Sequence, residues 1–206
     1  MKRLIATVTV LGVVLSAALL APLAGAAPAP VKVIEDPAGD ANFLNDQGTG
    51  DGSNGDQVTP ADVSSVTDLL EVNIANDKKN VYVTFVSEVA PPATQGVGFR
   101  LRANPDGPGG TNCLFVEAFY PGAGNALEEA EAYVRDTCAG GEAIAVEVLS
   151  NQVIIPRKSL AAFKKGSTIK APQAQGFIYV GSSYPAGAAY PVVDTTKTGT
   201  DYKLKG

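Results

Sequence analysis

The stretch DLLEVNIANDKKNVYVTFVSEV, residues 68–89, decides the fold of this 206-residue chain. Apolar residues at positions 70, 72 and 74 alternate with polar residues at 71 and 73, which is the period of a strand with one buried face. The segment 76–80 has the Asn and Asp residues of a turn. Residues 81–89 carry β-branched and aromatic side chains on both faces, as in a central strand. Together these segments predict a β-hairpin.

Short strands of this kind recur between turns that are rich in glycine and proline. A helical turn is expected at 159–163, after a proline at position 156. Short strands at this spacing with almost no helix predict an all-β fold, a two-sheet antiparallel β-sandwich of jelly-roll type with one short helical turn. The other expected strands cover 31–34, 97–102, 113–120, 131–138, 143–149, 152–155, 168–170, 177–181, 192–194 and 202–204.

The first 26 residues have the pattern of a secretory signal peptide. Two basic residues precede an apolar run over 4–20, and small residues follow at 24–26. We expect cleavage after Ala26, an extended leader at 27–30 and a single sandwich domain over 31–206 that is secreted. The alternative is an uncleaved membrane anchor, against which stand the shortness of the run and the lack of a basic flank after it. We expect no membrane span after cleavage.

The charge and composition of the chain exclude several classes of function. The formal net charge is −5, and without Lys2 and Arg3 the remaining 14 basic residues face 21 acidic ones, a net charge near −7. Such a surface repels phosphate backbones, which argues against a nucleic-acid partner. Histidine is absent, which excludes Ser-His and Cys-His nucleophiles and histidine-ligated metals. Tryptophan is also absent, so the chain lacks the usual stacking platform for sugars.

Cys113 and Cys138 are the only cysteines, and an even count in an exported protein predicts a disulfide. The alternatives are a reactive thiol and a redox pair, which lack a C-x-x-C motif and a neighbouring base. A turn centred between positions 125 and 126 places these two cysteines opposite each other on adjacent strands. The same register is expected to pair Phe115 with Asp136 and Glu117 with Val134.

The segment Asp36-Pro37-Ala38-Gly39-Asp40 directly follows a predicted strand. Its proline fixes one φ angle and its glycine permits a positive one, so a tight reversal is expected to bring the Asp36 and Asp40 carboxylates together. Two adjacent carboxylates repel each other unless a cation lies between them, and oxygen ligands suit calcium. Asp68 is a plausible third carboxylate. The alternative is that these aspartates only cap turns through their own backbone.

The first part of the chain resembles the opening of DOMON-like sandwich modules. It has, in order, a strand, the Asp36–Asp40 turn, a glycine-rich loop, and the segments Asp68 to Val72 and Asn80 to Phe85. These modules are related to family-nine carbohydrate-binding modules and to C-terminal modules of some glucan-degrading enzymes. The similarity is best over 31–89 and weaker over 153–160. The chain also resembles exported proteins of high-GC Gram-positive bacteria that open with the same Asp-Pro-Ala-Gly-Asp motif.

The resemblance implies a two-sheet β-sandwich with calcium at Asp36, Asp40 and Asp68, and one face that binds sugar or haem. Haem ligation is excluded because the chain has no histidine and its only methionine is Met1. The tryptophans that hold sugar in binding members of the family are missing from this chain.

Five further residues are candidate ligand-binding residues. Tyr179, Tyr184 and Tyr190 cluster around a late loop, where exposed rings would stack on a sugar; the alternative is that they are half-buried anchors. Arg100 and Arg102 share one face of a strand and suit a carboxylate or an acidic glycan; the alternative is a solvated edge paired with Glu117 or Asp136.

These observations lead us to expect an exported, non-catalytic module that binds carbohydrate or another extracellular polymer and contains a structural calcium site. One alternative is a cell-surface structural or protein-interaction domain without sugar binding, and another is a hydrolase that uses carboxylates. No G-x-S-x-G nucleophile elbow is present. The acidic residues over 128–131 are expected to form a solvated loop tip rather than a catalytic pair.

Overall fold

The computed structural model describes residues 28–41, 61–104, 114–123, 127–136, 142–159, 161–179 and 192–206. Within these ranges the chain forms eleven β-strands, one α-helix and one 3-10 helix. The predicted signal peptide and the glycine-rich segment 42–60 lie outside the described residues.

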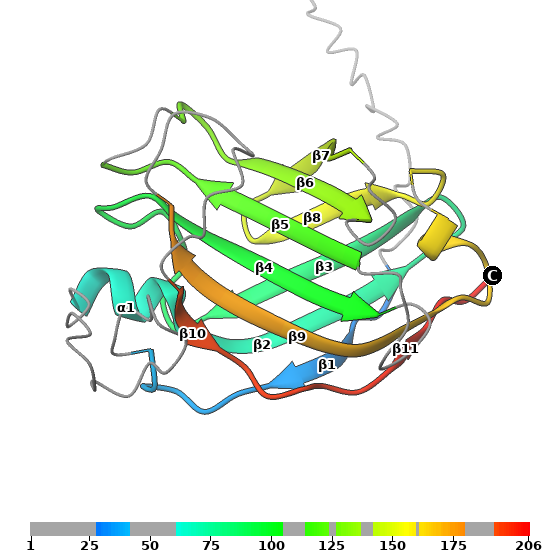
Figure 1. Cartoon of the computed structure of the whole chain (residues 1–206), viewed down its shortest axis with the longest axis horizontal. Coiled ribbons are helices and arrows are strands. Elements are labelled where there is room, and N and C mark those ends of the chain that lie inside the picture. Colours follow the sequence, from blue (N-terminus) through cyan, green and yellow to red (C-terminus); the bar gives the residue numbers. More distant parts are fainter. Residues whose placement is uncertain are drawn as a thin grey trace, which may run out of the picture.

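The elements follow the predicted succession of short strands, and the all-β prediction is confirmed (Figure 1). The predicted hairpin over 68–89 is formed by β2 and β3. The predicted helical turn after residue 156 is the 3-10 helix. The elements are β1 (Val31–Glu35), α1 (Ala61–Thr67), β2 (Leu69–Asn76), β3 (Asn80–Ser87), β4 (Val97–Asn104), β5 (Leu114–Tyr120), β6 (Glu131–Asp136), β7 (Ile144–Leu149), β8 (Gln152–Pro156), the 3-10 helix η1 (Ala161–Phe163), β9 (Thr168–Ile178), β10 (Val192–Thr195) and β11 (Tyr202–Lys203).

The two layers of the sandwich are one continuous antiparallel sheet that curls over at β7 (Figure 1). Residues 144–146 of β7 pair with β6, and residues 147–149 pair with β8. The strand order is β1-β2-β3-β8-β7-β6-β5-β4-β9-β10, with β11 paired to β9. The curl therefore turns one face of the sheet inward and leaves the other face outside.

The two ends of the strand order, near β1 and β10, are joined by the segment that links β10 to β11. The amide of Thr196 donates to the carbonyl of Ala174, and the amide of Gly199 donates to the carbonyl of Pro172, both in β9. The amide of Thr200 donates to the carbonyl of Val33 in β1 at 2.7 Å. These bonds join the first strand of the order to β9, so both edges of the curled sheet are tied.

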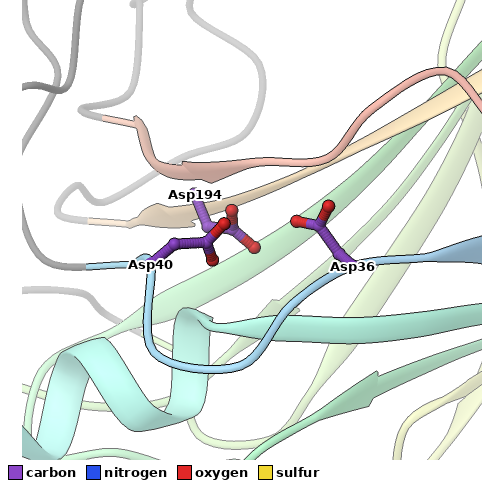
Figure 2. Close-up of side chains that lie close together, drawn as sticks. All are labelled: Asp36, Asp40 and Asp194. Atoms are coloured by element: carbon purple, nitrogen blue, oxygen red, sulfur yellow. The ribbon is translucent and has the colours of Figure 1, made fainter.

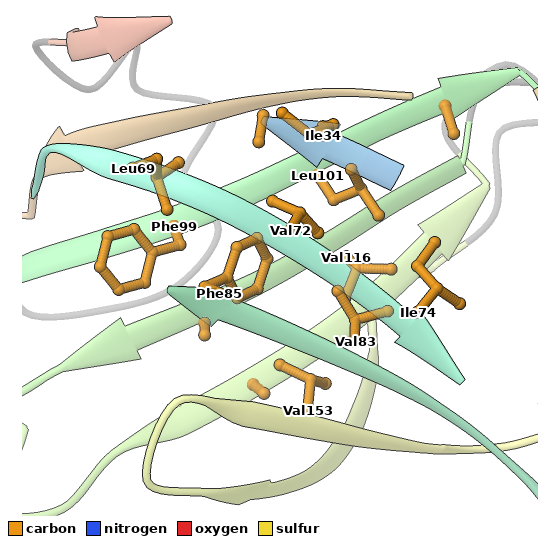
Figure 3. Packing of buried hydrophobic residues seen from close by; sticks show 14 of the residues in the cluster. Ile34, Leu69, Val72, Ile74, Val83, Phe85, Phe99, Leu101, Val116 and Val153 are labelled. Atoms are coloured by element: carbon orange, nitrogen blue, oxygen red, sulfur yellow. The ribbon is translucent and has the colours of Figure 1, made fainter. Parts of the chain in front are cut away.

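The core fills the space between the two layers, as Figure 3 shows. The predicted alternation holds from Val72 onward, since Val72, Ile74 and Val83 are fully buried. It is wrong at its first position, because the register shifts before Glu71, so that Leu69 is fully buried and Leu70 only partly. The rings of Phe85 in β3 and Phe99 in β4 stack across the layers with centroids 5.4 Å apart. These inward side chains hold the layers together through the hydrophobic effect and close packing.

The predicted register of β5 and β6 is wrong by one residue. Phe115 pairs with Arg135, and Glu117 pairs with Tyr133. In an antiparallel pair, residues directly opposite each other share a face, so the predicted pairing of Glu117 with Val134 would have turned a core valine outward. The observed register instead pairs the inward residues of both strands. The pairing of the two cysteines, predicted from the same register, lies outside the described residues.

The two late strands predicted over 168–170 and 177–181 form one strand, β9. The residues between the two predicted strands include Pro172 and Gly176, and β9 accommodates both. Between Lys170, opposite Asn104, and Gln173, opposite Arg102, the register shifts. Ala171 has a positive φ of 46° there, so Pro172 lies in a bulge, where its missing amide proton costs no ladder bond.

Helix α1 was not anticipated from the sequence, although a threonine followed by a proline, as at positions 59 and 60, is typical of the sequence around a helix start. The helix packs its C-terminal end against the backbone of β9. A Cβ added at Gly176 would collide with the carbonyl oxygen of Thr67, so glycine at this position allows the helix to approach the sheet.

Replacing Phe85 with Ala is expected to lower the free energy of unfolding by roughly 3–5 kcal/mol, because it removes a fully buried ring and leaves a cavity between the layers. The measurement is chemical denaturation followed by circular dichroism. Leu149→Ala is the control, since Leu149 is 55% exposed and its truncation should have little effect. Similar losses for both variants would contradict the assignment of the core.

Candidate functional site

The turn after β1 is held by one hydrogen bond to a backbone carbonyl and one to a side-chain carboxylate. The amide of Asp36 donates to the carbonyl of Leu70 at 2.9 Å, so the turn begins from a paired strand. Gly39 has a φ of +84°, the left-handed region that glycine adopts without strain. Its amide donates to Oδ2 of Asp68. The chain therefore reverses toward the junction between α1 and β2.

The reversal brings three carboxylates together. Oxygen atoms of Asp36, Asp40 and Asp194 all lie within 4.8 Å of one another (Figure 2). The first two come from the turn and the third from β10. Oδ2 of Asp194 accepts a hydrogen bond of 2.8 Å from the amide of Leu69, so the start of β2 fixes its orientation. We call Asp36, Asp40, Asp194 and the adjacent Asp68 the aspartate cluster.

Asp68 supports the cluster from the junction of α1 and β2. It is 1% exposed, and its own amide donates to the carbonyl of Ser64 in α1. Its Oδ2 receives the Gly39 amide, whereas Oδ1 is buried without a hydrogen-bond partner, as is Oδ2 of Asp36. Buried carboxylate oxygens without a donor are costly unless a cation compensates them.

The surroundings of Asp36, Asp68 and Asp194 oppose ionisation of these three carboxyl groups. Burial raises the pKa of Asp194 to about 7, the Leu69 amide opposes this shift, and the neighbouring carboxylates add to it. The pKa of Asp36 is raised by burial and then by Asp40, although Lys197 lowers it through its amide and its charge. Burial also raises the pKa of Asp68, against the bond from the Gly39 amide. A bound cation would reverse these effects, because it favours the charged carboxylates.

The donor set suits a hard divalent cation. Calcium takes oxygen ligands from carboxylates, backbone carbonyls and water, and the cluster offers four carboxylates at one edge of the sandwich. Asp36, Asp40 and Asp194 would supply the direct ligands. Asp68 lies beside them and holds the turn through Gly39.

The structure brings Asp36 and Asp40 together, as predicted, but the third carboxylate within 4.8 Å of both is that of Asp194. Asp68, predicted as the third ligand, lies beside this group and accepts the Gly39 amide. Sequence reasoning missed Asp194 because it ends a late strand far along the chain, and only the curl of the sheet places β10 beside the turn after β1. The available signal was an acidic residue at the end of the predicted strand 192–194.

Arg100 and Arg102 lie on the outer face of β4, as the strand pattern predicts. They do not lie at an edge, since β4 is paired on both sides, with β5 and β9. Nε of Arg100 donates to Oε1 of Glu117 at 2.6 Å, and Nη2 of Arg135 lies 3.2 Å from the same oxygen. The expected pairing with Glu117 thus applies to Arg100. The side chain of Arg102 is exposed.

Tyr179 is only 2% exposed and packs in a small aromatic cluster on the outer face. Its ring lies 4.7 Å from that of Phe119, centroid to centroid, and Phe119 in turn contacts Phe177 edge to face. Tyr179 is therefore an anchor of this cluster rather than an exposed ring. Tyr184 and Tyr190 lie outside the described residues.

No family model, curated protein or solved structure matches this chain. The resemblance to DOMON-like modules and the calcium at the cluster thus remain predictions. In the part of the chain that the structure describes, no helix has the length and apolar character needed to cross a bilayer.

In the metal-free protein, the free energy of unfolding is expected to fall as the pH rises from about 4 to about 7. The pKa of Asp194 is 3.8 ordinarily and about 7 when folded, so the folded state holds this proton more tightly than the unfolded chain. The stabilisation from this proton is complete below the pKa of Asp194 in the unfolded chain. It is lost as the pH rises through the pKa of Asp194 in the folded protein.

Urea denaturation in the presence of a chelator, at pH 5 and at pH 8, measures this change. The pKa of Asp77 is lowered by the amides of Asn80 and Lys79, so this group makes the free energy of unfolding rise with pH. A variant of Asp194 is therefore needed to isolate the contribution of that residue. Asp194→Asn should remove most of the difference in the free energy of unfolding between pH 5 and pH 8, because the variant has no proton to lose at this position. An unchanged pH dependence in this variant would contradict the assignment.

Proposed function

We propose that this chain is an exported, non-catalytic β-sandwich module that binds carbohydrate or another extracellular polymer, and that calcium stabilises it at the aspartate cluster. The observation that carries the proposal is the convergence of Asp36, Asp40 and Asp194 beside the buried Asp68. Asp40 is exposed, but the like charges of Asp68 and Asp194 beside it are buried. Buried like charges are unfavourable by themselves, so a cation accounts for their presence.

Calcium is the cation that the donors favour. All four side chains offer oxygen, and the chain has no histidine, so a zinc or copper site of imidazoles cannot form. The buried, unpartnered oxygens of Asp36 and Asp68 are positions where a cation replaces a missing donor. Extracellular modules commonly bind calcium weakly, because the surrounding calcium concentration is high.

The ion would act as a cross-link between the ends of the sheet. Asp36 and Asp40 follow β1, and Asp194 belongs to β10, the two terminal strands of the order. An ion shared by these carboxylates would hold the turn against β10 and reinforce the closed edge. Binding to the folded state alone stabilises that state by mass action.

The polymer-binding part of the proposal is supported by the outer face of β6, β5, β4 and β9. This face presents arginine, glutamine and aromatic side chains on a continuous sheet, among them Arg102, Phe115 and Gln175. Guanidinium and amide groups recognise polar ligands, and partly exposed rings stack on sugars. The resemblance of residues 31–89 to DOMON-like modules favours the same function.

Millimolar calcium is expected to raise the melting temperature of the purified protein above its value in chelator. At a calcium concentration one hundred times Kd, the gain is about 2.7 kcal/mol. Asp194→Asn should abolish the gain but be at least as stable as the parent protein in chelator, because it removes a buried like charge and retains an acceptor for the Leu69 amide. Differential scanning calorimetry measures both effects.

Glu147→Gln is the matched control, since it removes an exposed carboxylate from β7, remote in the strand order from β1 and β10. This variant should keep the full calcium gain. If Asp194→Asn also kept it, or if calcium left the parent protein unchanged, the cluster would not be a calcium site. Equal gains from magnesium and calcium would contradict the choice of ion.

The protein is expected to be retained on a polysaccharide column in calcium buffer and to leave the polymer intact. Cell-wall and plant polysaccharides are the supports to test, with eluted fractions assayed for released sugar. Passage through every support would favour a protein-interaction domain. Release of sugar that is lost on Glu or Asp substitution would favour a hydrolase.

A further inference from the structure

The strand register places arginine and aromatic residues in one row across the outer face. Arg135 in β6 is opposite Phe115 in β5, Phe115 is opposite Arg102 in β4, and Arg102 is opposite Gln173 in β9. Side chains directly opposite each other on adjacent strands lie on one face at short distance. The row therefore has an aromatic ring flanked by two guanidinium groups.

Three guanidinium groups surround this ring. Their central carbons lie 5.2 Å (Arg135), 5.7 Å (Arg100) and 6.0 Å (Arg102) from the centroid of the Phe115 ring. These distances are in the range of cation–π contacts. The single carboxylate among them is that of Glu117, so these five side chains carry a net charge of +2 on a protein whose overall charge is −5.

Glu117 fixes the arrangement without neutralising it. Its side chain is fully buried beneath the guanidinium groups of Arg100 and Arg135, whose side chains are 19% and 23% exposed. A buried carboxylate bonded to two arginines holds both in one orientation. Arg102 is exposed and forms no ion pair in the part of the chain that the structure describes.

We infer that this patch, formed by Phe115 with Arg100, Arg102 and Arg135, binds a carboxylate-bearing polysaccharide. The inference rests on the proposed polymer-binding function and names the class of polymer. The planar guanidinium of Arg102 pairs with a ligand carboxylate in a bidentate geometry. The partly exposed ring of Phe115 contacts the apolar face of the sugar.

The rest of the molecule favours a carboxylated polysaccharide over a nucleic acid. A local charge of +2 on an acidic protein is too small to hold a polyphosphate, whose binding needs many neutralised phosphates. A uronic acid polymer presents carboxylates separated by neutral sugar rings. That spacing suits a patch in which guanidinium groups flank one aromatic ring.

Isothermal titration calorimetry with a galacturonic acid trisaccharide, and with its methyl ester, tests this inference. Free calcium is held constant, because uronates also bind calcium. The acid is expected to bind and the ester to bind far more weakly, and added sodium chloride should weaken binding of the acid. Arg102→Gln should lower the affinity roughly tenfold, as expected for one lost charge-assisted contact.

Lys203→Gln is the matched control, since it removes an exposed positive charge from β11. The affinity of this variant for the trisaccharide should be unchanged. The calcium-dependent rise in melting temperature is measured on the same variants, and Arg102→Gln should retain it. Equal binding of acid and ester, or full affinity in Arg102→Gln, would overturn this inference. Retention of the protein on a polysaccharide column would still support the proposed polymer-binding function. Binding of dextran sulfate but of no uronate would overturn the choice of carboxylate.

Discussion

Strand β7 belongs to both layers of the sandwich, because its first half pairs with β6 and its second half with β8. The sheet must therefore curl, and the curl decides which face is buried. Phe85 and Phe99 face each other across the enclosed space, whereas Arg100 and Arg102 remain on the outside. The inward apolar face supplies the driving force for this closure, since a flat sheet would leave it in water.

The same curl sets the place of the candidate metal centre. The strands at the two ends of the order, β1 and β10, are brought to one edge, and the acidic residues after β1 meet the aspartate of β10 there. Asp68 and the Leu69 amide join them from the start of β2. Carboxylates from three separate segments thus converge where the sheet closes, and a shared cation would oppose their repulsion.

Local patterns predicted most of the fold. Alternation in 68–89 predicted the central hairpin, and the turn residues predicted the strand boundaries, because both depend on neighbours in sequence. The register of β5 and β6 was missed since it depends on which faces become buried, a property of the packed sheet. The continuity of β9 was missed because Pro172 lies in a bulge. A bulge is defined by the pairing with the neighbouring strand, so the sequence of β9 alone does not reveal it.

For the candidate site, the turn motif predicted Asp36 and Asp40 as neighbours, and Asp68 was inferred as their partner. The place of Asp194 in the cluster depends on the topology of the sheet alone. Likewise, Arg100 and Arg102 were predicted on a common face from the period of their strand, but Arg135 beside Phe115 required the register of the adjacent strands. Sequence patterns therefore identified residues within one segment, and the sheet supplied the partners from other segments.

The hydrogen bond from the Thr200 amide to the Val33 carbonyl has a consequence for how the protein reaches this structure. It joins segments at opposite ends of the domain, and contacts of such high sequence separation form slowly. Until residues near 200 arrive, the outer side of β1 presents unpaired backbone groups to the solvent. Such an edge pairs readily with strands of other molecules, so this protein is most vulnerable to aggregation during its own folding.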